Sequence, residues 1–257
     1  MTRRTLATAL VLAGLSFATN AGQPAALKPL SFRAEARVEV DEQGKLVKVE
    51  ASKDLPDAVR KYIEQQLATW TYARHSRANG DGNAATWVLL GACAVPKPDG
   101  TYALGLAYRG NGPRIADGGP WRVTSTLAST VGRHGIDGVA NVHFVVNADG
   151  SAKLESIDTK ITGIQRKALG PELAFFISRH RFDPEQVGGQ PVTTHEVLPV
   201  VFKSGRSKDG AETYDERLAE AMTSPQCRHA ELLASDAFNP GMRAMALDSV
   251  ISIEPKI

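Results

Sequence analysis

The sequence predicts an α+β fold made of two tandem modules, each a small antiparallel sheet with one helix packed on one face. In residues 138–203, two alternating apolar and polar stretches flank Asp149-Gly150, and a segment with the period of an amphipathic helix follows. An apolar strand over 192–202 completes that module, and a weaker version of the same order recurs over 32–110. Because such a sheet has one apolar face to bury, we expect the helix to lie across that face.

The N-terminus has the layout of a secretory signal. Arg3 and Arg4 precede an apolar run from Leu6 to Ala18, and small residues follow as far as Ala21. The run is shorter than the roughly 20 residues that a membrane-spanning helix needs. We therefore expect residues 1–21 to be a signal peptide that is cleaved after Ala21, with export to the periplasm. Retention of this segment as an inner-membrane anchor stays open.

Charge and cysteine content narrow the class of protein. Arg3 and Arg4 are the only charged residues among the first 21, so they account for the whole formal charge of +2. The remaining chain is neutral and offers no basic surface for nucleic acid or anionic lipid. In an exported chain, Cys93 and Cys227 form either one disulfide or two buried unpaired thiols.

Residues 32–110 are expected to form the first, diverged module. Glu42-Gln-Gly44 predicts a turn between two strands, residues 57–71 a helix, and residues 86–95 an apolar strand. Gly44 is equivalent to Gly150 if the chain is an internal duplication. Trp70-Thr-Tyr72 then occupies the place of His180-Arg-Phe182. The alternating segment 102–108 would extend this sheet by one strand.

The parts outside the modules are expected to be connecting segments. Residues 109–120 contain four glycines and two prolines, so we expect residues 111–137 to be a linker. Residues 204–257 would form a C-terminal extension with helices over 211–222 and 226–234. The segment 246–253 is expected to be either an edge strand or a frayed tail.

The second module contains the more specific sequence motifs. After the two strands around Asp149-Gly150, a helix is expected over 164–179, with a break or restart at Gly170-Pro171. Four short motifs occur in the same order as in one known protein family. They are Asp149-Gly150, Arg181-Phe182-Asp183-Pro184, Gly189-Gln190-Pro191-Val192 and Pro199-Val200-Val201-Phe202.

In these four motifs the second module resembles the C-terminal domain of the TonB family of energy transducers. The resemblance covers about a quarter of the chain well. The first module departs from the pattern, because Ala73 follows Tyr72 where the family has a residue and then proline, and Cys93-Ala-Val-Pro96 replaces the final Pro-Val-x-Phe. The resemblance implies a protein that binds the short box segment of outer-membrane receptors.

Residues able to carry catalysis are not arranged in a recognisable pattern. His143, His180 and His195 lie in the second module without the spacing of a metal site, and we expect His143 and His195 on the sheet face away from the helix. No nucleophile motif or phosphate loop is present. We therefore expect a binding protein and not an enzyme, with no cofactor and no metal.

Without catalytic side chains, the groups most able to bind a partner are the backbone N–H and C=O groups at a sheet edge. A three-stranded sheet covered on one face leaves an unpaired edge that can accept an extended peptide as a further strand. We expect that edge on the strand 192–202, flanked by Thr193, His195, Val197 and Val201, with an envelope protein or a receptor segment as partner. Coverage of this edge by 246–253 or by the other module stays open.

Three other functions remain: an anchored transducer, an envelope hydrolase or hydrolase inhibitor, and a purely structural role. The chain has no long proline-rich spacer of the kind an energy transducer needs to cross the periplasm. The sequence leaves the oligomeric state open.

Overall fold

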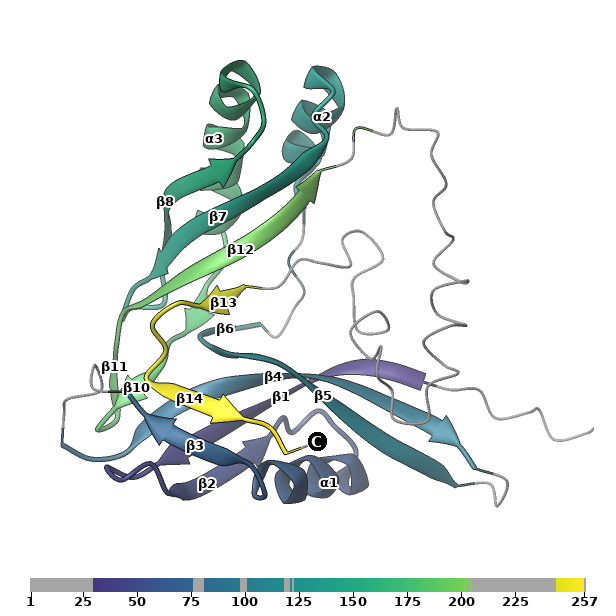
Figure 1. Ribbon diagram of the computed structural model, residues 1–257, viewed down its shortest axis with the longest axis vertical. Helices are drawn as coiled ribbons and strands as arrows, with labels where there is room; N and C mark the ends of the chain where they lie inside the picture. The colour runs from purple at the N-terminus through teal and green to yellow at the C-terminus, as the bar shows by residue number, and fades with distance from the viewer. Residues whose placement is uncertain are drawn as a thin grey trace, which may run out of the picture.

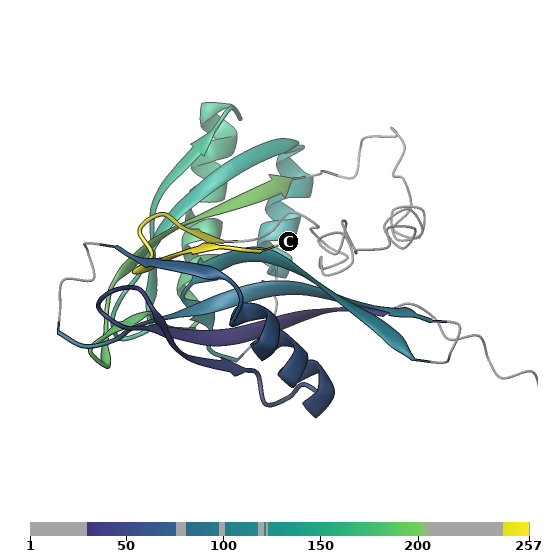
Figure 2. The ribbon, with the colours of Figure 1, turned by 60° about the horizontal axis from the view of Figure 1, so that its bottom comes forward.

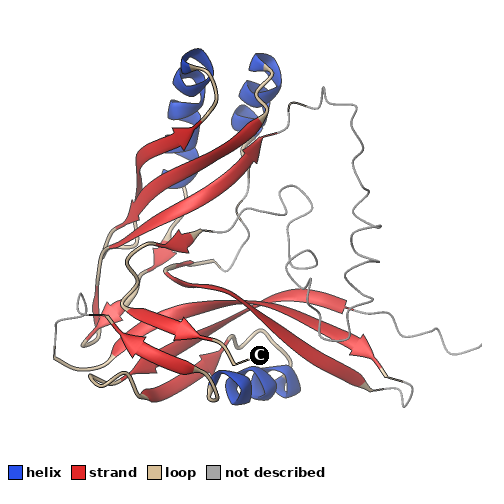
Figure 3. Ribbon diagram, viewed as in Figure 1, coloured by secondary structure: helices blue, strands red, loops and turns tan. Residues whose placement is uncertain are grey.

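The computed structural model describes residues 30–75, 81–97, 101–117, 121, 123–202, 204 and 244–256. In these ranges the chain forms antiparallel sheets and three helices, which confirms the α+β class. One half holds the sheet around β1 and β4 with helix α1, and the other holds the sheet around β7 and β12 with helices α2 and α3 (Figure 1). Figure 3 shows α1 at one end of the structure and α2 and α3 at the other, with the strands between them.

The first half begins with a hairpin. Its elements are β1 (Leu30–Val40), β2 (Leu46–Ala51), α1 (Asp57–Leu67), β3 (Thr71–Arg74) and β4 (Ala84–Pro96). β1 is central and pairs with β2 on one side and β4 on the other. The hairpin turn closes because the Asp41 carboxylate accepts hydrogen bonds from the backbone N–H groups of Gln43 and Lys45. Alternate residues of β1 pack against α1 in the core. They are Ala34, Ala36, Val38 and Val40 of β1, with Ile63 and Leu67 of α1.

The second half has a strand, strand, helix and strand in a similar order. Its elements are β7 (Gly138–Val146), β8 (Ala152–Thr159), α3 (Gly163–Ser178), β9 (Phe182–Asp183) and β12 (Thr194–Phe202). Between β9 and β12, the short strands β10 (Gln186–Val187) and β11 (Gln190–Pro191) join the sheet of the first half, because β10 pairs with β4 and with β11. β7 is central, between β12 and β8. A capping box of Thr162 and Gln165 starts α3.

Helix α3 continues through Pro171, so the expected break at Gly170-Pro171 is wrong. Proline removes one backbone donor, but buried side chains on both sides of it hold the helix against the sheet. These side chains are Leu169, Leu173, Phe176 and Ile177. Their burial outweighs the loss of one hydrogen bond.

Each half contains a similar close contact at a glycine of its hairpin turn. Gly44 has φ +79° and a Cβ there would lie 3.2 Å from the Tyr72 carbonyl oxygen; at Gly150, with φ +77°, the distance to the Phe182 carbonyl oxygen would be 2.3 Å. In both halves the hairpin turn therefore lies against the short strand segment that follows the helix. In both, the last strand returns beside the first, β4 on β1 and β12 on β7.

The expected linker over 111–137 is wrong, because this region is largely regular structure. It contains the end of β5 (Tyr102–Gly112), β6 (Arg114–Ile115) and α2 (Ser125–His134). β5 pairs with β4, β6 pairs with β9, and α2 packs beside α3. Gly110 and Gly112, at φ +144° and +146°, shape the end of a strand and do not form a flexible connection.

The C-terminal segment, residues 244–256, joins the two halves. It contains β13 (Met245–Ala246), which pairs with β12, and β14 (Ile251–Glu254), which pairs with β3. Figure 2 shows this segment, in yellow, between the two sheets. It is therefore strand and not a frayed tail. The expected signal peptide with its Ala21 cleavage site, the helices 211–222 and 226–234, and Cys227 lie outside the described residues.

Candidate binding site

The outer edge of β12 is partly covered by the C-terminal segment. Glu196 lies opposite Ala246 and Val197 opposite Met245. The Leu247 N–H donates to the His195 carbonyl oxygen at 2.8 Å, and the His195 N–H donates to Asp248 Oδ1 at 2.7 Å. Of the two possibilities that the sequence left open, the edge is therefore covered at His195 and Val197 and is not free there. The reason is tertiary: a segment 50 residues away in sequence supplies the missing strand.

A proline removes one backbone hydrogen-bond donor from this edge. N–H and C=O groups of one strand residue point to the same side, so the outward groups of β12 after His195 belong to Val197, Pro199 and Val201. Pro199 has no N–H, which is tolerated there because the edge position does not face β7. Val201 is exposed and Thr193 is half-buried, as expected for flanking positions. Each of these two residues makes an interaction of its own, so neither is counted as unoccupied.

The histidines serve packing and local contacts. His195 lies on the sheet face away from α3, with Nδ1 2.7 Å from Asp248 Oδ2 and Nε2 3.5 Å from Glu155 Oε1. It thereby joins the C-terminal segment to β8. His180 Nδ1 lies 2.8 Å from the Phe176 carbonyl oxygen, and its ring packs on Trp121. The described residues hold no group of three or more histidine, cysteine, aspartate or glutamate side chains placed to bind a metal ion.

Glu185 is the polar centre where the two halves and the C-terminal segment meet. It is fully buried, and its carboxylate accepts hydrogen bonds from Thr86 of β4, Thr194 of β12 and Ser249 at 2.6, 2.9 and 2.5 Å. The Val250 N–H lies 3.3 Å away as a fourth donor. Burial raises the pKa of Glu185, and these hydrogen bonds oppose the rise.

Glu196 is a second buried acid, and it is poorly satisfied. It points to the helix side of β12, and its Oε1 has no hydrogen-bond partner among the described residues. Burial raises the pKa of Glu196 well above its usual value, and the nearby Glu185 raises it further. A Cβ added to Gly112 would lie 2.8 Å from that same Oε1 and 2.9 Å from the Ala246 Cβ. Ala246 of β13 therefore helps to seal this carboxyl group from solvent.

We predict that Glu196→Gln stabilises the protein at neutral and alkaline pH. A raised pKa in the folded state means that the folded protein binds the proton more tightly, so wild-type stability falls as pH rises above the ordinary glutamate value of about 4.3. The amide cannot ionise, so the variant should lose this slope and gain about 1 to 3 kcal/mol at pH 8. Urea unfolding of the two proteins at pH 5 and pH 8 measures the pH slope and the gain in stability. An equal pH slope in the two proteins would contradict the assignment.

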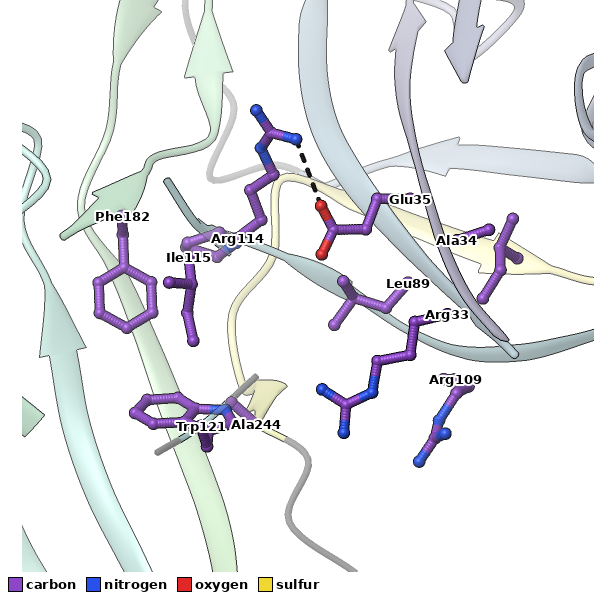
Figure 4. Close-up of a pocket in the computed structure, with 12 residues that line it drawn as sticks. Arg33, Ala34, Glu35, Leu89, Arg109, Arg114, Ile115, Trp121, Phe182 and Ala244 are labelled. Carbon is purple, nitrogen blue, oxygen red and sulfur yellow. Dashed lines mark hydrogen bonds and ion pairs between the residues drawn. The ribbon is translucent and has the colours of Figure 1, made fainter. Parts of the chain in front are cut away.

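A cavity of about 70 Å³ lies between the halves, beside Ala244 at the start of the C-terminal segment (Figure 4). Leu89, Ile115, Trp121 and Phe182 form its apolar wall. The polar lining consists of Arg33, Glu35, Arg109 and Arg114.

Arg114 is held firmly within this lining. It pairs with Glu35 at 3.3 Å and Asp183 at 2.8 Å, and its guanidinium lies 3.6 Å from the centre of the Trp87 ring. Burial raises the pKa of Glu35, and Arg114 opposes this rise. The cavity thus combines an apolar wall with a polar lining in which Arg114 is already paired with carboxylates, a setting suited to an apolar group.

Cys93 is buried and disulfide-bonded, while Cys227, the other cysteine of the chain, lies outside the described residues. No helix in the described ranges is long and apolar enough to cross a membrane. No family model, curated protein or solved structure matches the chain.

Sequence reasoning missed Glu185, Glu196 and the cavity. One signal was readable: Glu196 shares the parity of Leu198, Val200 and Phe202, the core side of β12. An acid at a core position of a strand marks a special environment. Glu185 follows Pro184 in a loop with no such period, and the cavity is formed by residues from both halves, so neither had a local signal.

Proposed function

We propose that this chain is an exported envelope protein with two TonB C-terminal-like modules, and that it binds an extended protein segment by strand addition at the outer edge of β12. The partner would be an envelope protein or a segment of an outer-membrane receptor. The proposed binding needs no catalytic group, cofactor or metal. Mature protein would begin near Gly22, and the intact mass of the periplasmic protein tests that.

The observation that carries the proposal is the difference between two equivalent edges. In the first half, β5 covers the edge of β4 over ten residue pairs. In the second half, β13 covers the edge of β12 over two. An edge held by two residue pairs and the Asp248 contacts is far easier to open, and it already accepts an antiparallel strand. The partner would replace residues 245–248 and pair with the same groups of β12.

The neighbours of β13 restrict the partner. Ala246 lies opposite Glu196 and beside Gly112, where its Cβ would be 2.9 Å from an added Gly112 Cβ. A small residue at this position of the incoming segment would keep the same packing. The residue two places earlier would lie beside the cavity at Ala244, where an aromatic side chain would meet the apolar wall.

The experiment is site-specific photo-crosslinking in cells. A benzoylphenylalanine at Val201, beside the proposed site, should capture one envelope protein through a single linear segment. Asp248→Ala removes the acceptor for the His195 N–H and should raise the yield several-fold, because it weakens the internal competitor. A probe at Val47 on β2, an exposed position far from this edge, is the matched control. Equal capture at both positions, or no response to Asp248→Ala, would contradict strand exchange.

A further inference from the structure

Helix α3 carries a second apolar face on the side away from its sheet. Its buried face consists of Leu169, Leu173, Phe176 and Ile177. On the opposite side Ile164, Ala168, Pro171 and Phe175 follow at intervals of four, three and four residues. Ile164 is 79% exposed and Phe175 57%, and both lie on a helix at the outer end of the second half (Figure 1). Such a stripe is unusual on a helix that already buries its other face.

The spacing is that of a seam between two helices. Alternation of four and three residues keeps apolar side chains facing a neighbouring helix, with Ile164 and Pro171 at d positions and Ala168 and Phe175 at a positions of a heptad. The seam runs from Ile164 to Phe175, about 16 Å along the helix axis. The small Ala168 near its middle lets two backbones approach, while Ile164 and Phe175 supply apolar area at the ends.

The flanking charges identify a second copy of the same helix as the occupant. In this heptad Lys167 falls at g and Glu172 at the following e, and in a parallel pair g faces e five residues further along the other helix. Lys167 would then face Glu172 of the second copy, twice by symmetry. An antiparallel pair would bring Lys167 towards Lys167 instead. Within the described residues, neither side chain is engaged in another ion pair.

We propose that the outer face of α3 is a homodimer interface, formed by a parallel, symmetric pair of α3 helices. This surface is separate from the β12 edge and does not depend on the function proposed above. A seam of two heptads is smaller than a standard stable interface, so the dimer is weak and concentration-dependent. In it, each residue of the seam meets its own counterpart.

Cysteine crosslinking tests the register directly. In a parallel pair, Phe175→Cys alone should form a disulfide-linked dimer, and so should Ile164→Cys alone. An antiparallel pair would crosslink only when Ile164→Cys and Phe175→Cys are combined. No dimer from either single variant under oxidising conditions would overturn the proposed arrangement.

Sedimentation over a concentration series tests the energetics. Phe175→Glu should weaken association at least tenfold, whereas Val47→Glu, which changes an equally exposed apolar residue on β2, should not. Lys167→Glu and Glu172→Lys should each weaken it, and the double exchange should restore it. A wild-type chain that stays monomeric would overturn the proposal, and Phe175-dependent binding of that monomer to phosphatidylglycerol vesicles would assign the face to a membrane instead.

Discussion

Glu185→Ala is expected to destabilise the protein by about 3 to 5 kcal/mol. The carboxylate accepts four hydrogen bonds from groups of β4, β12 and the C-terminal segment. Each such bond contributes about 1 kcal/mol, and each buried donor left without a partner costs a similar amount or more. Alanine also leaves a cavity at a fully buried position. Urea unfolding of the oxidised protein, followed by intrinsic tryptophan fluorescence, measures the change.

Two variants make this result specific. Glu155 is an exposed glutamate on β8 whose ion pair with His195 is long, at 3.5 Å, so Glu155→Ala should change stability by less than about 0.5 kcal/mol. Glu185→Gln keeps one acceptor oxygen and can present its amide to the Thr86 and Ser249 hydroxyls, which also accept hydrogen bonds. It should therefore cost less than alanine. Equal stability of Glu185→Ala and Glu155→Ala would show that Glu185 does not hold the halves together.

Phe182→Ala is expected to cost about 3 to 5 kcal/mol, as for other large-to-small changes of a buried aromatic residue. Phe182 is 5% exposed and packs with Trp121 and Phe144 at ring-centre distances of 5.8 and 6.0 Å. It also lines the cavity between the halves. The variant should therefore shift the unfolding midpoint strongly while it leaves the secondary-structure content unchanged.

Phe175 supplies the matched control for this change. It is seven residues away in the same half but is 57% exposed on α3, so Phe175→Ala should change stability by less than about 0.5 kcal/mol at concentrations where the chain is monomeric. The comparison removes the effect of residue type and keeps only burial. A loss for Phe182→Ala as small as that for Phe175→Ala would place the ring outside the core.

Local periodicity was a good guide to single elements. The alternation around Asp149-Gly150 predicted the hairpin of β7 and β8, and the equivalence of Gly44 with Gly150 led to two turns that pack against Tyr72 and Phe182 in the same way. These features depend on neighbours in the chain and on glycine at positive φ, which a sequence displays openly. Pro171 misled because the burial that carries α3 through it comes from the sheet beneath.

The candidate site was harder to foresee, because its parts come from distant segments. Val197 and His195 were chosen as members of an open edge, but whether an edge is open depends on what else in the chain lies beside it. Residues 245–248 do so here, and the residues of β12 with which they pair lie about 50 positions earlier in the sequence. Their sequence is β-prone, yet nothing local says which strand they join.

By itself, the sequence determined the α+β class, the two hairpins, the positions of the helices α1 and α3, and the parity that puts His143 and His195 on the outer sheet face. These follow from period, turn residues and side-chain size. The tertiary structure alone decided that Arg114 and Trp121 belong to packed structure, that Glu185 joins three segments, and that β13 occupies the β12 edge. Such pairings depend on the free energy of burying whole surfaces against one another, and no local pattern encodes it.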